Sequence, residues 1–221
     1  MDPTIACDLY RHAGKADFPT LLKYLLYSPG FRFTFFLRKA SQRKPGSLVW
    51  IFYKLFHRRY FYKYGFQIPL TTKIGKGLHI AHFGNVVLHV NASLGENCNL
   101  CHGITIGQAN RGERKGYPSL GNKVWVGTGA VIVGKIVVGD NVLIAPNSYV
   151  NFDVPSNSIV LGNPGKVIPK EDATLGYIES IMDPAPQSSA QVQPKQAAAS
   201  AHDMILPVSA KALTDLHGNR R

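Results

Sequence analysis

A six-residue rhythm of aliphatic side chains constrains the fold of this chain more than any other feature. An Ile, Leu or Val recurs every six residues, apart from two interruptions, at Ile68, Ile74, Ile80, Val86, Leu94, Leu100, Ile106, Leu120, Val126, Ile132, Val138, Ile144 and Val150. A period of six fits neither the 3.6-residue turn of one helix nor the two-residue alternation of one long strand. It fits a coil of short strands and tight turns, in which each aliphatic residue points inward.

Small residues accompany this rhythm. Gly or Ala often follows the aliphatic residue, as in Gly75, Gly95 and Gly127, and a small or aliphatic residue stands four positions after it. Glycine suits a tight turn in which a side chain would be costly, and the residue four positions on is expected to point inward as well. The pattern therefore predicts a mainly β structure, a coil over residues 66–170.

The two interruptions mark places where the coil holds additional residues. A solenoid expels such residues as loops rather than distorting its core. The step from Val86 to Leu94 is eight residues, which predicts a small bulge there. The second step, from Ile106 to Leu120, is fourteen residues. Residues 108–119 carry several charges and little of the rhythm, so they are expected to form an exposed loop.

The segments outside the coil differ from it in composition. Apolar residues at helical spacing predict two or three short helices over residues 18–65, separated by the Pro-Gly pairs of "YSPGF" and "RKPGS". Residues 1–17 are expected to be a flexible N-terminus. Residues 171–221 are poor in aromatic residues and mostly rich in Pro, Gln, Ser and Ala, so this tail is predicted to be largely disordered.

Positive charge is concentrated in the first third of the chain. Residues 11–67 hold twelve Lys or Arg and a single acid, Asp17. This excess predicts a contact with something acidic, either an anionic membrane surface or an acidic glycan precursor, and not nucleic acid. A helical cap on the coil, with no such partner, is the alternative.

Cysteine usage and hydropathy bear on the compartment. Three cysteines argue against a disulfide framework, and the start of the chain lacks the pattern of a secretion signal. No apolar run approaches the ~20 residues that span a bilayer. The expectation is a cytoplasmic protein, with peripheral contact at the inner face of a membrane left open.

Four stretches of the sequence resemble a known family. "IGKGLHIAHFGNVV", "ITIG", "VWVGTGAVIVGKIVVGDNVLIAPNSYV" and "GNPGKVI" resemble the hexapeptide-repeat acyltransferases, and among them most closely the serine acetyltransferases and the colanic-acid-type polysaccharide O-acetyltransferases. The resemblance covers about residues 28–170. It implies a left-handed parallel β-helix with three hexads per turn, a homotrimer with active sites between neighbouring coils, acetyl-CoA as co-substrate, and no metal.

The resemblance also implies roles for individual residues. The family's general base precedes a short Gly-containing turn, which matches His82 in "AHFGN". A histidine suits this role because its pKa lies near working pH. Gln67 stands where the serine enzymes carry an aspartate that orients the base, and an amide could orient it without charge. The alternative is that His82 is an ordinary surface histidine. His79 and His89 are expected on outer faces in structural roles.

Two further sets of residues follow from the same resemblance. Coenzyme A is expected along backbone-lined turns and one cation, at Gly107, Thr128, Gly129, Ala145 and Lys166. The acceptor is expected to contact Phe83, Asn85, His102, Gln108 and Tyr117.

Departures from the serine enzymes bear on the acceptor. This chain has Gln67 and Ala81 in place of two aspartates, and Gly-Tyr-Pro at Tyr117 in place of Arg-His-Pro. The charged groups of the serine enzymes suit a zwitterionic amino acid. Their absence from this chain favours a neutral sugar hydroxyl of a surface or capsular polysaccharide or its precursor as the acceptor. Serine is the alternative acceptor.

Two other functional classes stay open. His82, His89 and His102 could hold zinc across a trimer interface, as in the β-helical carbonic anhydrases, although the closing Gly-Asn-Pro-Gly-Lys loop would then have no purpose. A non-catalytic binding solenoid is the other class. Cys98 and Cys101 have Cys-x-x-Cys spacing but occupy positions of the repeat, so they are expected to fill the core rather than bind metal.

Overall fold

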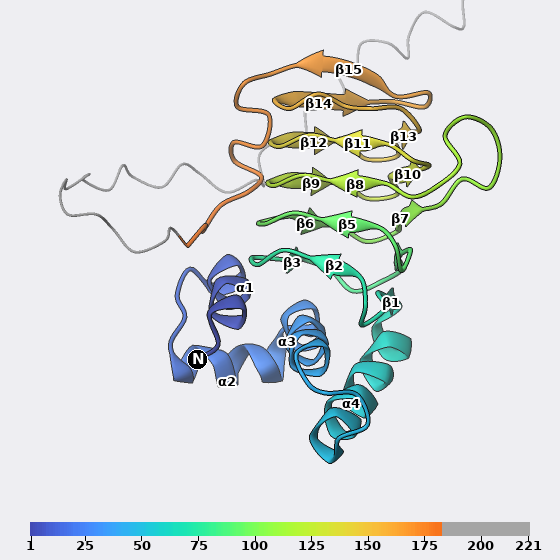
Figure 1. The fold of residues 1–221 in the computed structure, drawn as a ribbon. Helices are drawn as coiled ribbons and strands as arrows, with labels where there is room; N and C mark the ends of the chain where they lie inside the picture. Colours follow the sequence, from blue (N-terminus) through green and yellow to red (C-terminus); the bar gives the residue numbers. More distant parts are fainter. Residues whose placement is uncertain (183–221) are drawn as a thin grey trace, which may run out of the picture. The chain divides into compact units, whose positions relative to one another are not determined.

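The computed structural model describes residues 1–182, in which four helices precede a coil of short strands (Figure 1). The helices are α1 (Pro3–Ala13), α2 (Phe18–Tyr27), α3 (Pro29–Ser41) and α4 (Leu48–Tyr64). The strands are β1 (Phe66–Gln67), β2 (Lys73–Ile74), β3 (His79–Ile80), β4 (Val86–Leu88), β5 (Ser93–Leu94), β6 (Asn99–Leu100), β7 (Ile104–Gly107), β8 (Ser119–Leu120), β9 (Val124–Val126), β10 (Val131–Val133), β11 (Val137–Val138), β12 (Val142–Ile144), β13 (Tyr149–Val150), β14 (Ser158–Leu161) and β15 (Lys166–Pro169).

The strands stack into three sheets that form the sides of the coil. Sheet A has the order β1-β4-β7-β10-β13, sheet B the order β11-β8-β5-β2, and sheet C the order β15-β14-β12-β9-β6-β3. Neighbouring strands pair in parallel, except that β14 and β15 are antiparallel. Each turn of the chain passes through sheets B, C and A, so the predicted left-handed parallel β-helix is confirmed.

Aliphatic columns fill the inside of the coil. Leu100 is in register with Ile80 below it and Val126 above it. Of the thirteen rhythm positions, twelve are buried, and Ile74 packs partly buried against the same core. The small or aliphatic residues four positions on, such as Cys98 and Ala130, are also buried. The inward placement predicted from the six-residue period is therefore confirmed.

The first interruption of the rhythm lies one corner earlier than predicted. Ile80 is in register with Leu100, but the partner of Ile106 is Leu88 rather than Val86. The two additional residues therefore belong to the corner 81–85, and not to the segment between Val86 and Leu94. Val86 and Leu88 are both apolar and both buried, so the aliphatic spacing could not distinguish the two placements.

Side-chain caps begin all four helices. Asp2, Asp17, Ser28 and Ser47 each accept a hydrogen bond from a backbone N–H of the first turn, which satisfies donors that the helix itself leaves free. Ser28 both ends α2 and caps α3, at the Pro-Gly pair that predicted a break there.

Helix α1 overturns the prediction of a flexible N-terminus over residues 1–17. Its Ile5 and Leu9 are buried together with Phe31 of α3. Asp8, which is 1% exposed, forms an ion pair of 2.9 Å with Arg38 and accepts the Leu78 backbone N–H at 2.9 Å. Burial raises the pKa of Asp8, and the neighbouring Arg38 opposes that rise. A cation in the basic first third thus has a structural partner that the charge count did not reveal.

Residues 171–182 follow a defined course along sheet C, so this part of the predicted disordered tail is ordered. Ala173 joins a small core cluster with Leu143 and Ala145. The Tyr177 ring packs edge-on against Trp125 with centroids 4.9 Å apart. The remainder of the predicted tail, residues 183–221, lies outside the described residues. Among the helices that the structure describes, none has the length and hydropathy of a membrane span.

Candidate active site

The coil turns at three edges, and each edge has its own residues. The histidine edge, between sheets C and A, consists of residues 81–85, 101–103, 127–129 and 145–147. The glycine edge, between sheets B and C, consists of residues 75–77, 95–97, 121–123, 139–141 and 155–157. The loop edge, between sheets A and B, consists of residues 69–72, 89–92, 108–118, 134–136 and 151–153.

His82 is exposed in the widened corner of the histidine edge, directly after β3. Its ring lies edge-on to that of His102, with centroids 5.8 Å apart and an interplanar angle of 89°. Gly84, with a φ of 136°, passes close to His102 of the next coil, where an added Cβ would lie 3.1 Å from the His102 Cβ. The two inserted residues and this glycine let the corner carry two imidazoles side by side. Phe83 and Asn85 are exposed in the same corner.

Small residues continue the histidine edge beyond His102. The Gly129 backbone N–H donates to the His102 carbonyl at 3.1 Å, and the Asn147 N–H donates to the Thr128 carbonyl at 2.9 Å. Gly103 and Gly129 have φ values of 73° and 72°, a region that favours glycine. The edge is therefore a strip of backbone and small side chains that rises about 4.8 Å with each coil.

Four of the five residues predicted for coenzyme A lie along this strip. Thr128, Gly129 and Ala145 belong to it, and Lys166 is exposed opposite Leu161, the end of β14 next to the same edge. Gly107, the fifth, ends β7 on the other side of sheet A. The structure thus aligns the cofactor candidates with His82 except for Gly107.

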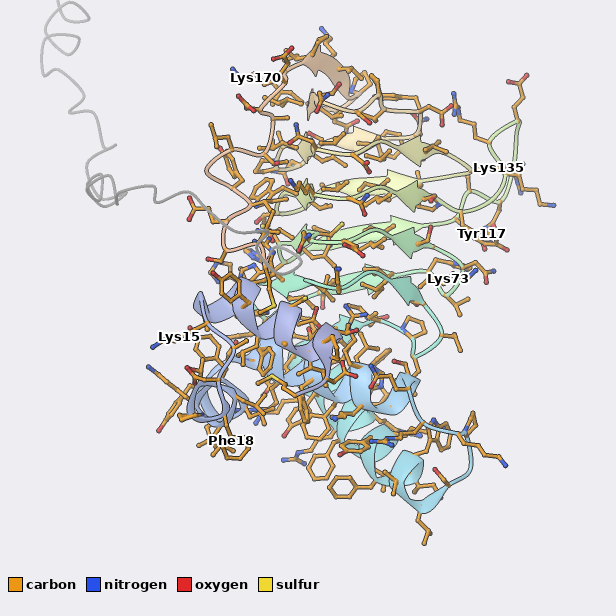
Figure 2. The ribbon with its side chains drawn as sticks, turned by 60° about the vertical axis from the view of Figure 1, so that its left-hand side comes forward. Lys15, Phe18, Lys73, Tyr117, Lys135 and Lys170 are labelled. Carbon is orange, nitrogen blue, oxygen red and sulfur yellow. The ribbon has the colours of Figure 1, made fainter. Side chains whose placement is uncertain are left out.

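Two of the predicted acceptor residues, Gln108 and Tyr117, lie elsewhere, on the loop edge, and Figure 2 labels Tyr117 there. Residues 108–118 form the exposed loop, in which the backbones of Ala109 and Gly116 exchange two hydrogen bonds of 3.0 Å. The Tyr117 ring stacks on His89 at 4.5 Å and 17°. Between His102 and Gln108 the chain crosses sheet A, roughly 20 Å of extended backbone at ~3.3 Å per residue. One chain therefore brings together His82, Phe83, Asn85 and His102, but not Gln108 or Tyr117.

Gln67 is exposed on β1, in register with Val87 of β4. It lies on the outer face of sheet A, one strand below the strand that follows the His82 corner. Within residues 1–182, no hydrogen bond joins Gln67 to His82. Its role in orienting the base therefore stays a prediction.

His79 departs from the expectation that it decorates an outer face. It is half-buried, with its ring centroid 4.2 Å from that of His12 of α1. Burial lowers the pKa of His79 to about 4 and holds the pKa of His12 well below its usual range. Both rings are therefore neutral near pH 7 and pack α1 onto β3, next to the His82 corner. His12 was missed because an isolated histidine near the chain start carries no distinguishing signal.

The cysteines and the third histidine show no metal geometry. Burial raises the pKa of Cys98 to about 12, and that of the partly buried Cys101 is raised for the same reason. His89 lies on the loop edge, away from His82 and His102. Within the described part of the chain, no group of three His, Cys, Asp or Glu side chains could hold a metal ion.

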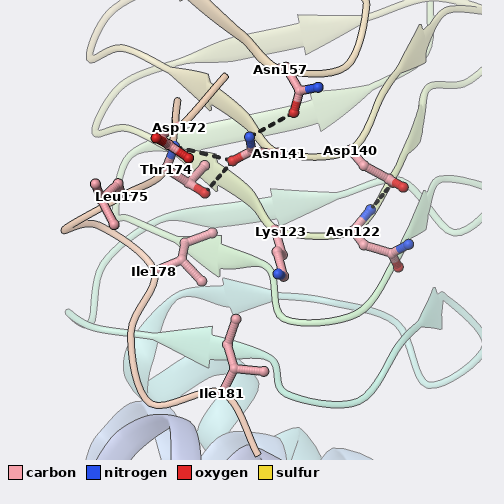
Figure 3. A pocket seen from close by; sticks show the side chains of 10 residues that line it. All are labelled: Asn122, Lys123, Asp140, Asn141, Asn157, Asp172, Thr174, Leu175, Ile178 and Ile181. Carbon is pink, nitrogen blue, oxygen red and sulfur yellow. Dashed lines mark hydrogen bonds between the residues drawn. The ribbon is translucent and has the colours of Figure 1, made fainter. Parts of the chain in front are cut away.

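The described chain has surface hollows of about 370, 540, 550 and 590 Å³, and none of these four is lined by His82. The 540 Å³ hollow lies at the glycine edge, where Lys123 and Asn141 face Thr174 and Ile178 of the C-terminal segment (Figure 3). Within residues 1–182, His82 is thus exposed to solvent and is not covered by any of these four hollows.

Comparisons with known proteins match this architecture. Residues 117–151 match the family model described as bacterial transferase hexapeptide (six repeats). Serine acetyltransferase of Helicobacter pylori (strain ATCC 700392 / 26695) is 39% identical over 107 residues, which cover 48% of this chain and 63% of the relative. Serine acetyltransferase of Synechococcus elongatus is 35% identical over 128 residues, which cover 58% of this chain and 52% of the relative. The chain thus spans between half and two thirds of the length of these curated relatives.

Solved structures agree with the fold. Serine acetyltransferase from Brucella abortus strain S19 aligns with a TM-score of 0.62 and 26% identity, over 76% of this chain and 68% of that one. The same enzyme in complex with coenzyme A gives 0.63 and 26%, over 76% and 67%. Soybean serine acetyltransferase complexed with serine gives 0.62 and 28%, over 76% and 70%.

Proposed function

Because the chain belongs to the hexapeptide-repeat transferases, we propose that it is an acetyl-CoA-dependent O-acetyltransferase with His82 as general base. The observation that carries this proposal is the histidine edge. There the exposed imidazole of His82 lies in the widened first corner. The corners above it consist of glycines and small side chains, and they lie in a row that ends near Lys166. The relative of the same fold that was solved with coenzyme A supports the same assignment.

The histidine edge fits acetyl-CoA as a co-substrate. Gly103 is exposed and Gly129 is half-buried, and neither covers the strip with a side chain. Thr128 offers a hydroxyl, and Lys166 offers a cation to a phosphate. Three coil steps of about 4.8 Å separate the His82 corner from residues 145–147, so roughly 14 Å of strip is available to a pantetheine arm.

His82 would serve as base and then as acid in one direct transfer. It takes the proton from the acceptor hydroxyl as that oxygen bonds to the acetyl carbonyl carbon. When the carbon–sulfur bond breaks, His82 returns the proton to the departing sulfur, so coenzyme A leaves as the thiol. Acetyl-CoA and the alcohol are thereby converted to the acetyl ester and coenzyme A, with no acyl-enzyme.

We further propose that the working enzyme is a homotrimer with its sites between chains. Gln108 and Tyr117 lie on the loop edge, which sheet A separates from His82. In a threefold assembly the loop edge of one chain can face the histidine edge of the next, which unites the two sets of acceptor residues and covers His82.

Mixed trimers test this arrangement. Chains with His82→Ala keep an intact loop edge, and chains with Tyr117→Ala keep an intact histidine edge. If the site lies between chains, trimers assembled from both variants regain activity that neither variant has alone. A monomer in sedimentation analysis, or mixtures no more active than their components, would contradict the proposal.

For the acceptor, the relatives favour L-serine, since the named ones are serine acetyltransferases and one was solved with serine. We propose serine as the first candidate. A sugar hydroxyl is the second, because residues 81–85, 101–103, 127–129 and 145–147 include no Lys, Arg, Asp or Glu. The histidine edge itself thus offers no charged partner to an α-amino or α-carboxylate group.

A thiol-release assay separates these candidates. Full-length protein and acetyl-CoA are supplied with L-serine, with neutral monosaccharides, or with polysaccharide fragments. Turnover with serine alone excludes the sugar acceptor, and turnover with sugars alone excludes serine. If no acceptor releases thiol and calorimetry detects no acetyl-CoA binding, the acetyltransferase proposal itself is overturned.

A further inference from the structure

Helices α2 and α4 present large apolar side chains to solvent. On α2, Phe18, Leu22 and Leu26 follow one another at intervals of four residues on one face, and Leu26 is 67% exposed. On α4, Leu55 is 61% exposed. We call this set the apolar-basic face, and it comprises Phe18, Leu22, Lys23, Leu26, Tyr27, Leu48, Ile51, Phe52, Lys54, Leu55, Arg58, Arg59 and Tyr62.

The exposed apolar residues of α4 belong to a helix whose opposite side is well packed. The other side of α4 packs on α3 and the coil, with His57 and Tyr64 buried and the Phe56 ring stacked on Phe36 of α3 at 5.0 Å. Helices of soluble proteins usually place charged and polar residues opposite their buried side, and exposed apolar patches larger than usual mark interaction sites. The apolar-basic face therefore lacks a partner within the described chain.

The charge of this face is of one sign. No Asp or Glu occurs between Asp17 and Glu96 in the sequence. Two cations of the face lie over aromatic rings, with Lys54 4.3 Å from the Trp50 centroid and Arg58 5.8 Å from that of Tyr62. None of the ion pairs in residues 1–182 involves a cation of this face. Its positive charges are thus available to an anionic partner.

A hollow beside α4 combines apolar walls with positive charge. It measures about 370 Å³ and is lined by Trp50, Phe61, Tyr62 and Leu70 together with Lys54 and Arg58. Aromatic and aliphatic walls with two cations suit the junction between an acyl chain and a phosphate headgroup, where Tyr and Trp also concentrate in membrane proteins.

Both helices lie at the end of the described chain that is farthest from β15. Figure 1 shows α2 and the start of α4 beyond the first coil, and Figure 2 places Phe18 at this end. The His82 corner belongs to that first coil, which follows the helices directly. A surface that binds this end therefore lies close to the candidate active site.

Two other occupants fit the face less well. A second copy would bring cations against cations with no acid between them, which opposes association. Residues 183–221 hold four Lys or Arg and three Asp, so they supply no acidic complement either. An anionic bilayer offers both the apolar layer and the negative charge.

We propose that α2 and α4 dock this protein on the surface of an anionic lipid bilayer. The apolar side chains enter the boundary between headgroups and acyl chains, and the lysines and arginines meet the lipid phosphates. Docking itself is independent of the proposed function. Only its consequence, that His82 works beside a membrane where a lipid-linked acceptor is presented, rests on that function.

Vesicle sedimentation of the full-length protein tests the docking. The protein is expected to bind phosphatidylcholine vesicles that contain phosphatidylglycerol, to bind phosphatidylcholine alone far less, and to be released by salt. The pair Lys54→Gln and Arg58→Gln should weaken binding at least about tenfold, because each basic residue near an anionic surface contributes about fivefold. The pair Phe52→Asn and Leu55→Asn should weaken it as well.

The matched control is Arg111→Gln with Lys115→Gln, which removes the same charge from the loop edge and should leave binding unchanged. Circular dichroism checks that each variant folds. No binding to anionic vesicles, or an equal loss in the control, overturns the proposal. Self-association without lipid that Leu26→Glu abolishes assigns the face to a second copy instead. Acetyl transfer to soluble acceptors, measured without vesicles, tests the proposed function separately.

Discussion

The glycine edge and the histidine edge are corners of the same coil, yet only one of them is regular. Every corner of the glycine edge begins with Gly or Pro and has a left-handed residue two positions later, such as Asn97 (φ 58°), Lys123 (52°) or Asn141 (53°). At the histidine edge the first corner holds two additional residues, and exposed imidazoles stand at His82 and His102.

Hydrogen bonds explain the regularity of the glycine edge. The Glu96 backbone N–H donates to Asn122 Oδ1 at 2.8 Å, the Asn122 N–H to Asp140 Oδ1 at 2.6 Å, and the Asp140 N–H to Ser156 Oγ at 2.9 Å. The side chains of this ladder hold neighbouring coils together and are not free for chemistry. Because the glycine edge stabilises the coil, the histidine edge can depart from the regular pattern and carry a site.

The largest expected effect is on catalysis, at the histidine edge. His82→Ala should lower kcat by about 100-fold or more, because it removes the general base, while Tm stays unchanged since the side chain is exposed. Steady-state kinetics measure kcat, and calorimetry measures Tm. Glu96→Ala, an exposed change on the glycine edge, is the control and should keep kcat. A His82→Ala enzyme of normal activity would instead support the non-catalytic binding solenoid.

At the glycine edge the expected effect is on stability. A Cβ added at Gly95 would lie 2.6 Å from the backbone of Gly121, so Gly95→Ala forces two coils apart and should cost about 3 kcal/mol of unfolding free energy. Urea unfolding measures the loss. Gly107→Ala, whose Cβ would meet only ordinary contacts of 3.5 Å or more, should leave stability nearly unchanged. Equal losses in both variants would show that the close approach of coils at the glycine edge is not the cause.

Buried and exposed histidines should differ in their effect on acid stability. Burial lowers the pKa of His57 and of His79 to about 4. Between pH 6.5 and 4 the unfolded chain therefore binds protons that the folded chain does not, so stability falls as pH falls through this range. Between pH 6.5 and 5 each histidine should contribute a loss of roughly 2 kcal/mol.

Urea unfolding at several pH values measures this slope. His57→Phe keeps a ring in the buried site but cannot take up a proton, so its pH dependence should be flatter than that of the wild type. His82→Ala is the control, and its slope should match the wild type. An unchanged slope for His57→Phe would show that His57 is not responsible.

The smallest expected effect concerns the segment that covers the glycine edge. The Thr174 hydroxyl donates to Asn141 Oδ1 at 2.6 Å, and Thr174 is 5% exposed. Thr174→Val should cost about 1 kcal/mol, the usual net contribution of one hydrogen bond. Hydrogen exchange should show faster exchange near residues 174–178 and no change at β4. Uniform acceleration across the coil would indicate that the segment is integral to the core.

The coil was predictable because its signal is local and repeated. Each aliphatic residue of the rhythm had to face inward whatever its neighbours did, and twelve of the thirteen are buried. The place of the first insertion was not predictable, because Val86 and Leu88 satisfy the inward position equally well. Helix α1 was missed for a related reason, since the pair of Asp8 and Arg38 joins residues 30 apart and leaves no periodic trace.

The candidate site was predictable only in part. The turn in "AHFGN" indicated His82 through its resemblance to a family motif, and His102 is indeed its neighbour. The separation of Gln108 and Tyr117 from His82 could not be predicted, because spacing in the sequence does not determine which edge of the coil each residue occupies. The apolar residues of α2 and α4 likewise resemble those of ordinary buried helix faces in the sequence. Only the packing shows that they are exposed.

By itself, the sequence determined that the chain winds into a coil of hexads, which side chains line its interior and where a basic, aromatic region precedes it. These are properties of short stretches, in which period and composition suffice. The tertiary structure alone decided which corners share an edge, where the inserted residues lie and which helix faces stay exposed within residues 1–182. Each of these depends on the register between coils, or on packing between segments distant in sequence, and no local pattern contains that information.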